Sequence, residues 1–224
     1  MSLDAADTAA ASHSGSAATS SRSESVASSE PSRPSQPPLQ KKLVVVGDPN
    51  VGKTTLLTVF KSGVFPTVYE PTVFENSVKD IIVDSKPVEL LLWDTAGQEG
   101  MDRVRVMSYN KADAVLLCFA FDSTISFENI QHKWIKEVLK HCRDSKIILV
   151  GLKTDLRGEG ASPSKADVRT FGVSVAEQLA IKLELDGYIE CSAKANQGVT
   201  EVFTQAVRAT LAIDVGGKKK CSIM

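Results

Sequence analysis

The stretch Leu43–Leu57, LVVVGDPNVGKTTLL, begins as an apolar strand, turns at a glycine and continues into an apolar helix. Residues 47–54 within it fit the pattern G-x-x-x-x-G-K-[ST] at a strand-to-helix junction. Backbone N–H groups of such a loop converge on phosphates, aided by the helix N-terminus. We expect Lys53 to reach the terminal phosphates and the Thr54 hydroxyl to take a position on Mg²⁺. The stretch therefore predicts a nucleotide-binding loop without saying which nucleotide it holds.

Composition excludes several classes of protein. The chain has 224 residues, of which 26 are Lys or Arg and 27 are Asp or Glu, so its formal net charge of −1 gives no global field favouring nucleic acid. Apolar runs stay well below the roughly 20 residues that span a bilayer, and the N-terminus lacks the apolar region of a secretory signal. The four cysteines follow no metal-ligand spacing and form no disulfide framework, which favours a reducing compartment. Core packing is expected for three of them, Cys118, Cys142 and Cys191, whereas Cys221 lies four residues from the C-terminus.

Residues 1–40 differ in composition from the rest of the chain. They contain 12 Ser and 8 Ala, with four Pro between Pro31 and Pro38 and almost no large apolar side chains. Such a segment cannot bury enough surface to offset its ordering entropy, so we predict a disordered N-terminal extension.

From residue 42 onward, strand and helix patterns alternate. One hairpin among otherwise crossover connections predicts an α/β fold in which helices cover both faces of a six-stranded, mostly parallel sheet. Ligands bind such sheets beyond the carboxyl ends of the strands. The expected strands are 43–46, 76–83, 87–93, 114–121, 146–152 and 187–193, and the expected helices are 54–60, 127–138, 175–183 and 199–207.

The segment LLLWDTAGQE places Asp94 at the end of a buried strand. A carboxylate there can hold Mg²⁺ through water, and Gly97 lets its backbone N–H approach a γ-phosphate. Gln98 is then suited to orient an attacking water. Together with the phosphate loop, this segment predicts hydrolysis of a nucleoside triphosphate.

Five segments in this order and spacing resemble a small GTPase of the Rho type in the Ras superfamily. They are the phosphate loop, FPTVYEPTVFEN (65–76), WDTAGQE (93–99), LKTDL (152–156) and ECSAK (190–194). The likeness covers residues 41–213, implies the P-loop NTPase G-domain fold, and includes a segment near 157–171 that resembles the Rho family's inserted helix. The nearest resemblance is to the fungal Rho group associated with polarised growth, actin organisation and secretion.

The resemblance implies roles for individual residues. Thr72 should close over Mg²⁺ and the γ-phosphate beside Tyr69, Phe65 should pack edgewise on guanine, and Asp155 should pair with N1 and N2 of the base. Implied catalytic residues are Lys53, Thr72 and Gln98, and implied metal-site residues are Thr54, Thr72 and, through water, Asp94. The implied nucleotide-binding residues are Asp48, Pro49, Asn50, Val51, Gly52, Lys53, Thr54, Thr55, Phe65, Tyr69, Thr72, Asp94, Gly97, Leu152, Lys153, Asp155, Ser192, Ala193 and Lys194. The implied effector region is Tyr69, Glu70, Pro71, Thr72, Val73, Phe74, Glu75 and Asn76.

The base-reading segment agrees with guanine and departs from the family at one position. A carboxylate at Asp155 accepts two N–H bonds from guanine, whereas adenine would leave it unpaired. The usual motif is Asn-Lys-x-Asp, but this chain has Leu152 at its first position. We predict that nucleotide binding survives with faster dissociation.

Pro49 is the second departure. In the family the phosphate-facing donors begin one residue later, at Asn50, so a missing N–H at Pro49 need not break the loop. The ring projects where an activating protein's arginine approaches, and in the family proline is the mild exception among side chains that block hydrolysis. We predict intact slow hydrolysis and an altered response to the activator, which stimulation of Pro49→Gly and parent to the same extent would contradict.

No arginine immediately precedes Thr72, since its neighbours are Glu70 and Pro71. The arginine finger is then supplied by a partner, and this predicts a slow, regulated switch. The expected partners are exchange factors, activating proteins, a GDI-like carrier and effectors. Two alternatives are a hydrolysis-impaired, GTP-loaded membrane scaffold, which Pro49 and Leu152 motivate, and an ATP-dependent P-loop kinase, which Asp155 disfavours.

The end of the chain, GGKKKCSIM, predicts lipidation. Cys221 begins a C-a-a-X-like tetrapeptide whose final Met224 favours farnesyl. Lys218–Lys220 can add attraction to an anionic cytoplasmic leaflet. We therefore expect residues 214–224 to be a hypervariable tail that anchors the protein reversibly at the cytoplasmic face of the plasma membrane, with a cytosolic pool.

Overall fold

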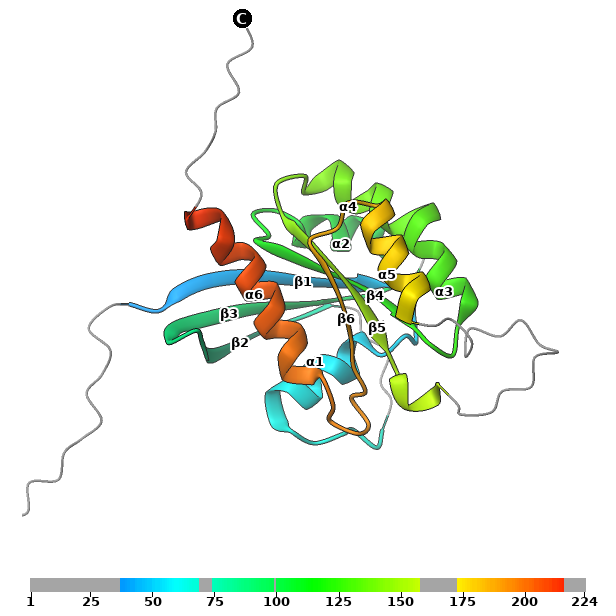
Figure 1. Ribbon diagram of the computed structural model, residues 1–224, viewed down its shortest axis with the longest axis horizontal. Coiled ribbons are helices and arrows are strands. Elements are labelled where there is room, and N and C mark those ends of the chain that lie inside the picture. The colour runs from blue at the N-terminus through cyan, green and yellow to red at the C-terminus, as the bar shows by residue number, and fades with distance from the viewer. Residues whose placement is uncertain (1–36, 69–73, 99, 158–172, 216–224) are drawn as a thin grey trace, which may run out of the picture. The chain divides into compact units, whose positions relative to one another are not determined.

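The computed structural model describes residues 37–68, 74–98, 100–157 and 173–215. Predictions for the N-terminal extension up to residue 36, the insert at 158–172 and the lipidated tail lie outside these residues. The described chain forms one six-stranded sheet in the order β2-β3-β1-β4-β5-β6 (Figure 1). Its strands are β1 (Leu39–Gly47), β2 (Phe74–Val83), β3 (Lys86–Thr95), β4 (Ala114–Ala120), β5 (Lys146–Leu152) and β6 (Gly187–Glu190).

The predicted sheet is confirmed in its pairing. All neighbours are parallel except β2, which pairs antiparallel with β3. The turn between them is shorter than predicted, because Lys86 already pairs with Val83 and only two residues, Asp84 and Ser85, form the loop. Both have positive φ, 49° and 64°, which is the backbone of a type I′ hairpin turn.

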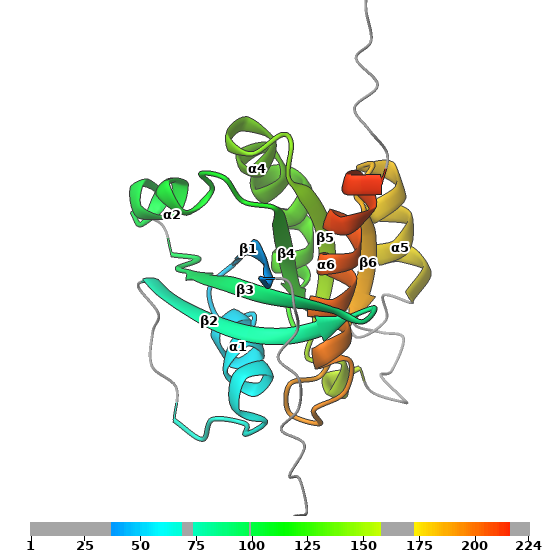
Figure 2. The same cartoon turned by 90° about the vertical axis from the view of Figure 1, so that its left-hand side faces the viewer.

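Helices cover both faces of the sheet, as predicted (Figures 1 and 2). On one face lie α1 (Lys53–Ser62) and α6 (Val199–Val215), and on the other lie α2 (Asp102–Ser108), α3 (Thr124–Asn129), the π-helical turn η1 (Ile130–Trp134), α4 (Ile135–His141) and α5 (Val173–Lys182). Strand β1 is continuously apolar over Leu43–Val46 because both of its faces are covered by helices. Leu43 and Val45 pack under α1 and α6, whereas Val44 and Val46 pack under the opposite helices.

Three local predictions needed correction. The helix expected over 127–138 is interrupted by η1, although Phe127, Ile130, Trp134 and Val138 are all buried as predicted. On α5 the predicted core positions were Val175, Leu179 and Leu183. Leu179 is buried as predicted, but Val175 is 38% exposed, and Ala176 and Ala180 are buried beside Leu179. Strand β6 ends at Glu190 rather than at residue 193. Helix α2 had no predicted counterpart.

The described cysteines pack in the core, as predicted. Cys118, Cys142 and Cys191 are buried and free, and burial raises the pKa of each thiol. None of the helices in the described parts of the chain combines the length and apolar character that crossing a bilayer requires.

Candidate nucleotide-binding site

The phosphate loop joins β1 to α1. Lys53 opens the helix and is only 6% exposed, and its ammonium donates to the carbonyl oxygens of Gly47 at 3.0 Å and Asp48 at 2.8 Å. Desolvation lowers the pKa of Lys53, although nearby acidic groups oppose this. Asn50 and Gly52 have positive φ, 61° and 105°, so the loop turns its backbone around the buried lysine. This geometry suits a cation held at the base of a phosphate cradle.

The Asp48 side chain turns away from the loop's concave side. Its carboxylate accepts hydrogen bonds from Asn129 Nδ2 and Trp134 Nε1, each at 2.7 Å. Asp48 does not line the described cavities. Asp48 was predicted to bind the nucleotide. Because its carboxylate is held by Asn129 and Trp134, any such contact would come from its backbone.

Asp94 lies near the end of β3 and is 3% exposed. Burial raises the pKa of Asp94, while the nearby Thr54 hydroxyl and Lys53 ammonium oppose that rise. Neither carboxylate oxygen makes a hydrogen bond of normal geometry to another described residue. A buried acidic oxygen pair beside a hydroxyl is an oxygen-only donor set, which is what Mg²⁺ prefers. The described residues therefore fit the ion, and Thr72, its third predicted neighbour, lies outside them.

Gly97 follows β3 and is pressed against the phosphate loop. A Cβ atom placed on it would lie 2.5 Å from both the Asp48 carbonyl carbon and the Pro49 nitrogen, so only glycine fits. Gln98 comes next and lines a cavity of about 550 Å³ together with Pro49, Lys53 and Thr54. The predicted catalytic glutamine and the unusual proline thus face the same space.

A second cavity of about 290 Å³ continues from the first, because Gly52, Thr55, Phe65 and Lys153 line both. It brings together predicted nucleotide-binding residues from four parts of the chain. These are Val51, Phe65, Leu152, Asp155, Ala193 and Lys194. Phe65 is 43% exposed and Leu152 is 2% exposed, so one wall is open and the other is fixed in the core.

Polar groups at this end are held by one another. Ser192 is 1% exposed and its hydroxyl donates to Asp155 Oδ1 at 2.6 Å, while it accepts from the Ala195 N–H at 3.0 Å. The Lys153 side chain passes over Gly52, since a Cβ atom built on Gly52 would lie 3.9 Å from Lys153 Cε. The Lys153 ammonium pairs with the Asp122 carboxylate at 2.9 Å. The carboxylate expected to read guanine is therefore oriented before any base arrives.

Some residues around the site had not been predicted. Asp122 follows β4 at the same edge of the sheet as the other motifs, and that position was a usable signal. Asn129 and Trp134 hold Asp48, but the sequence pattern had marked only the core role of Trp134. Tyr69 and Thr72 lie outside the described residues, as do Glu70, Pro71 and Val73 of the predicted effector region.

Comparison with known proteins identifies the family. The Ras family model matches residues 42–212. This chain belongs to the Ras family. It is 47% identical over 191 residues to the GTP-binding protein RHO1 of Candida albicans, covering 83% of this chain and 96% of that protein. It is 47% identical over 185 residues to GTP-binding protein rho3 of Schizosaccharomyces pombe, covering 81% and 88% of the two chains. It is 49% identical over 189 residues to the human Rho-related GTP-binding protein RhoB, covering 82% and 95%.

These matches confirm the predicted Rho-type small GTPase, with its G-domain fold, its switch function and its GTP hydrolase activity. Ras-family members bind GTP and GDP and act through regulators and effectors. The comparisons give no support to the hydrolysis-impaired scaffold. The ATP-dependent kinase is likewise set aside by the family.

Proposed function

We propose that this Rho-type GTPase uses Mg²⁺ to hold GTP and releases GDP and phosphate slowly, with the residue roles expected from the sequence. One observation carries the proposal. The two joined cavities have the buried Lys53 at one end and, at the other, an Asp155 carboxylate that Ser192 orients for guanine. The buried Asp94 carboxylate lies beside Thr54 at the lysine end, without a hydrogen bond of normal geometry. That spacing of charges along one cleft suits a guanosine polyphosphate.

Each end of the cleft has its own task. Asp155 accepts the base N–H groups, with Ala193 and Lys194 completing the wall around them. At the other end Lys53 attracts the terminal phosphates, and Thr54 and Asp94 would hold Mg²⁺ with Thr72. The ion, when bound, neutralises charge on the β- and γ-phosphate oxygens. Gln98 orients the attacking water, and the chain has no arginine directly before Thr72 to supply a finger, so basal turnover is slow.

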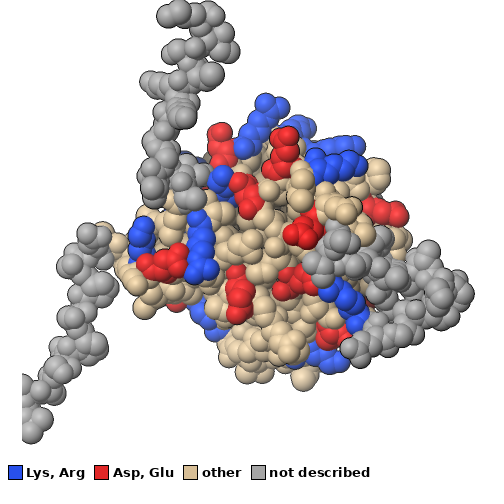
Figure 3. Space-filling view, viewed as in Figure 1, with Lys and Arg blue, Asp and Glu red and all other residues tan. Residues whose placement is uncertain are grey.

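The proposal extends to partners and anchoring. Exchange factors, activating proteins, a GDI-like carrier and effectors would bind around residues 65–76 and 98–109, with effectors reading Tyr69–Asn76. Farnesylated Cys221 and Lys218–Lys220 would bind the cytoplasmic face of the plasma membrane, leaving a cytosolic pool. The face in Figure 3 carries acidic and basic side chains interspersed, a pattern unlike the one-sign surface of nucleic-acid binders. Because the chain resembles the fungal Rho group associated with polarised growth, the proposal includes a role in cell polarity, actin organisation and secretion.

The test combines binding and turnover. Calorimetry with GDP, ADP and a GTP analogue, in Mg²⁺ and in EDTA, should give tight binding only to the guanine nucleotides and weaker binding after chelation. Single-turnover phosphate release should then fall about tenfold or more in Gln98→Leu, because water orientation is lost while binding is kept. Gln178→Leu on the exposed side of α5 is the matched control. Equal affinity for GDP and ADP, or unchanged turnover in Gln98→Leu, would overturn the proposal.

A further inference from the structure

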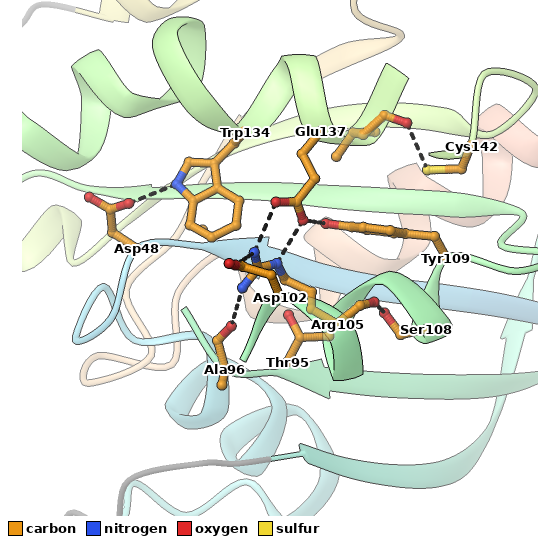
Figure 4. A network of polar contacts seen from close by, with 12 residues as sticks. Asp48, Thr95, Ala96, Asp102, Arg105, Ser108, Tyr109, Trp134, Glu137 and Cys142 are labelled. Atoms are coloured by element: carbon orange, nitrogen blue, oxygen red, sulfur yellow. Dashed lines mark hydrogen bonds and ion pairs between the residues drawn. The ribbon is translucent and has the colours of Figure 1, made fainter. Parts of the chain in front are cut away.

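Arg105 on α2 is a buried cation with several partners. It is 1% exposed, and a buried guanidinium is costly unless acceptors surround it. Figure 4 shows its side chain between three of them. Its Nη1 donates to the Ala96 carbonyl at 3.0 Å, and its Nε and Nη2 form a two-pronged pair with Glu137 at 2.7 and 2.9 Å. Asp102 accepts a further bond from Nη2.

The Ala96 contact places this cation against the catalytic segment. Ala96 is followed by Gly97, which touches the phosphate loop, and then by Gln98, which lines the phosphate cavity. The backbone before Gln98 is thus fixed from two sides. The phosphate loop holds it on one side, and Arg105 holds the carbonyl of Ala96 on the other.

The same cation also contacts the residue that holds the phosphate loop. The Arg105 guanidinium lies over the Trp134 ring, 4.8 Å from its centroid. Trp134 Nε1 donates to the Asp48 carboxylate at 2.7 Å, as the dashed line in Figure 4 marks. Trp134 ends the π-helical turn η1, and π-turns inside helices are often found at functional sites.

Glu137 completes the arrangement from α4. It accepts from both prongs of Arg105 and from the Tyr109 hydroxyl at 2.7 Å. Burial alone would raise the pKa of Glu137, but these hydrogen bonds lower it overall. The carboxylate therefore stays charged and keeps the guanidinium in one orientation.

We infer that Arg105 is a positioning residue for GTP hydrolysis, which ties the segment presenting Gln98 to the phosphate loop through Trp134 and Asp48. This inference rests on the proposed role of Gln98. It assigns to Arg105 no contact with the nucleotide. The guanidinium fork acts on the Ala96 backbone and on the indole ring, so the glutamine and the loop facing the phosphates keep one relative placement.

The first experiment separates positioning from folding. Arg105→Lys keeps the charge but loses the two-pronged pairing with Glu137. The double variant Arg105→Gln with Glu137→Gln removes both charges, so that the largely buried Glu137 carboxylate is not left unpaired, and Asp102, which also loses its bond to Arg105, is exposed to solvent. Single-turnover hydrolysis should fall about tenfold or more in each, because a small misplacement of a reacting group costs rate. Dissociation of a fluorescent GDP should stay within about twofold, since the inference places no contact to the nucleotide on Arg105. Arg143→Gln, in the exposed loop after α4, should change neither rate.

A spectroscopic readout tests the link to Trp134. The chain has two tryptophans, so Trp93→Phe leaves Trp134 as the only indole. Its emission should change when GDP is replaced by a non-hydrolysable GTP analogue, and Arg105→Lys should abolish that change. Hydrolysis within twofold of the parent in both the Lys variant and the double variant would overturn the inference, as would an emission change unaffected by Arg105→Lys. If the parent protein itself hydrolyses no GTP, the proposed function fails together with the inference. If the parent hydrolyses GTP and the Arg105 variants behave like it, only the inference fails.

Discussion

The two ends of the nucleotide cleft are built on different principles. At the base end, polar side chains compensate one another within the protein. Ser192 holds Asp155, and Asp122 holds Lys153. These residues lie in the segments that directly follow β4, β5 and β6 and orient one another, so recognition of the base needs little rearrangement of this wall.

At the phosphate end the buried charges compensate one another only in part. Desolvation lowers the pKa of Lys53 and raises the pKa of Asp94, so each group is shifted toward its neutral form. Lys53 donates to two neutral carbonyls. Base selectivity is therefore preformed in the protein, whereas charge balance at the other end depends on phosphate and metal.

The largest effect that would sharpen this comparison is expected from Asp155→Asn. The side chain is exposed, so folding should change little, and an amide can still accept from Ser192. Two hydrogen bonds to a charged acceptor are lost, each worth about 1.5–3 kcal/mol, so GDP affinity should fall about 100-fold or more. Calorimetry with GDP and xanthosine diphosphate measures this, because a carbonyl at C2 suits the new amide.

The matched control is Asp144→Asn in an exposed loop. GDP affinity within threefold of the parent in Asp155→Asn would mean that the oriented carboxylate does not read the base. The base end would then be no more selective than the phosphate end.

A smaller effect, with opposite signs in two conditions, is expected from Asp94→Asn. Burial raises the pKa of Asp94 in the folded, metal-free protein. Such a carboxyl contributes stability below its unfolded pKa of about 3.8, and this is lost as pH rises through the raised folded value. At pH 7 the ionised group therefore costs stability, and the amide removes that cost.

We expect Asp94→Asn to melt higher than the parent in EDTA, by up to about 2–4 °C if roughly 1 kcal/mol is recovered. With GDP and Mg²⁺ the order should reverse, because the amide holds the ion less well. Thermal unfolding at pH 7 in both conditions is the measurement, with exposed Asp80→Asn as control. A variant that melts lower than the parent in EDTA would contradict the uncompensated charge.

The sheet and the base pocket could be predicted because their signals are local in the chain. Continuous apolar runs predicted β1, β4 and β5, and the base-contacting motifs at 152–156 and 190–194 lie at the ends of β5 and β6. The two-residue hairpin loop was misjudged by one residue, because Lys86 looks like a turn residue but is paired with Val83. This one-residue error in the β2–β3 loop does not affect the predicted position of the nucleotide site.

The Arg105 arrangement could not be predicted in the same way. Arg105 and Glu137 lie 32 positions apart, and Trp134 and Asp48 lie 86 positions apart. An arginine between Val104 and Val106 looks like a solvated helix residue, and only tertiary packing surrounds it with acceptors. The extra residue of the η1 turn likewise leaves no mark on a pattern read at 3.6 residues per turn.

The smallest effect tests whether the base end is optimal. Leu152 fills a buried position in the wall of the base cavity and packs near Gly52. Leu152→Asn restores an amide that can hydrogen-bond near the base, worth about 1 kcal/mol net, so GDP dissociation should slow about fivefold. Stopped-flow release of a fluorescent GDP measures this, with Leu139→Asn on the exposed side of α4 as control. If release is unchanged while the melting temperature falls, the amide is merely a buried polar group without a partner, and the apolar wall is already the better solution for this chain.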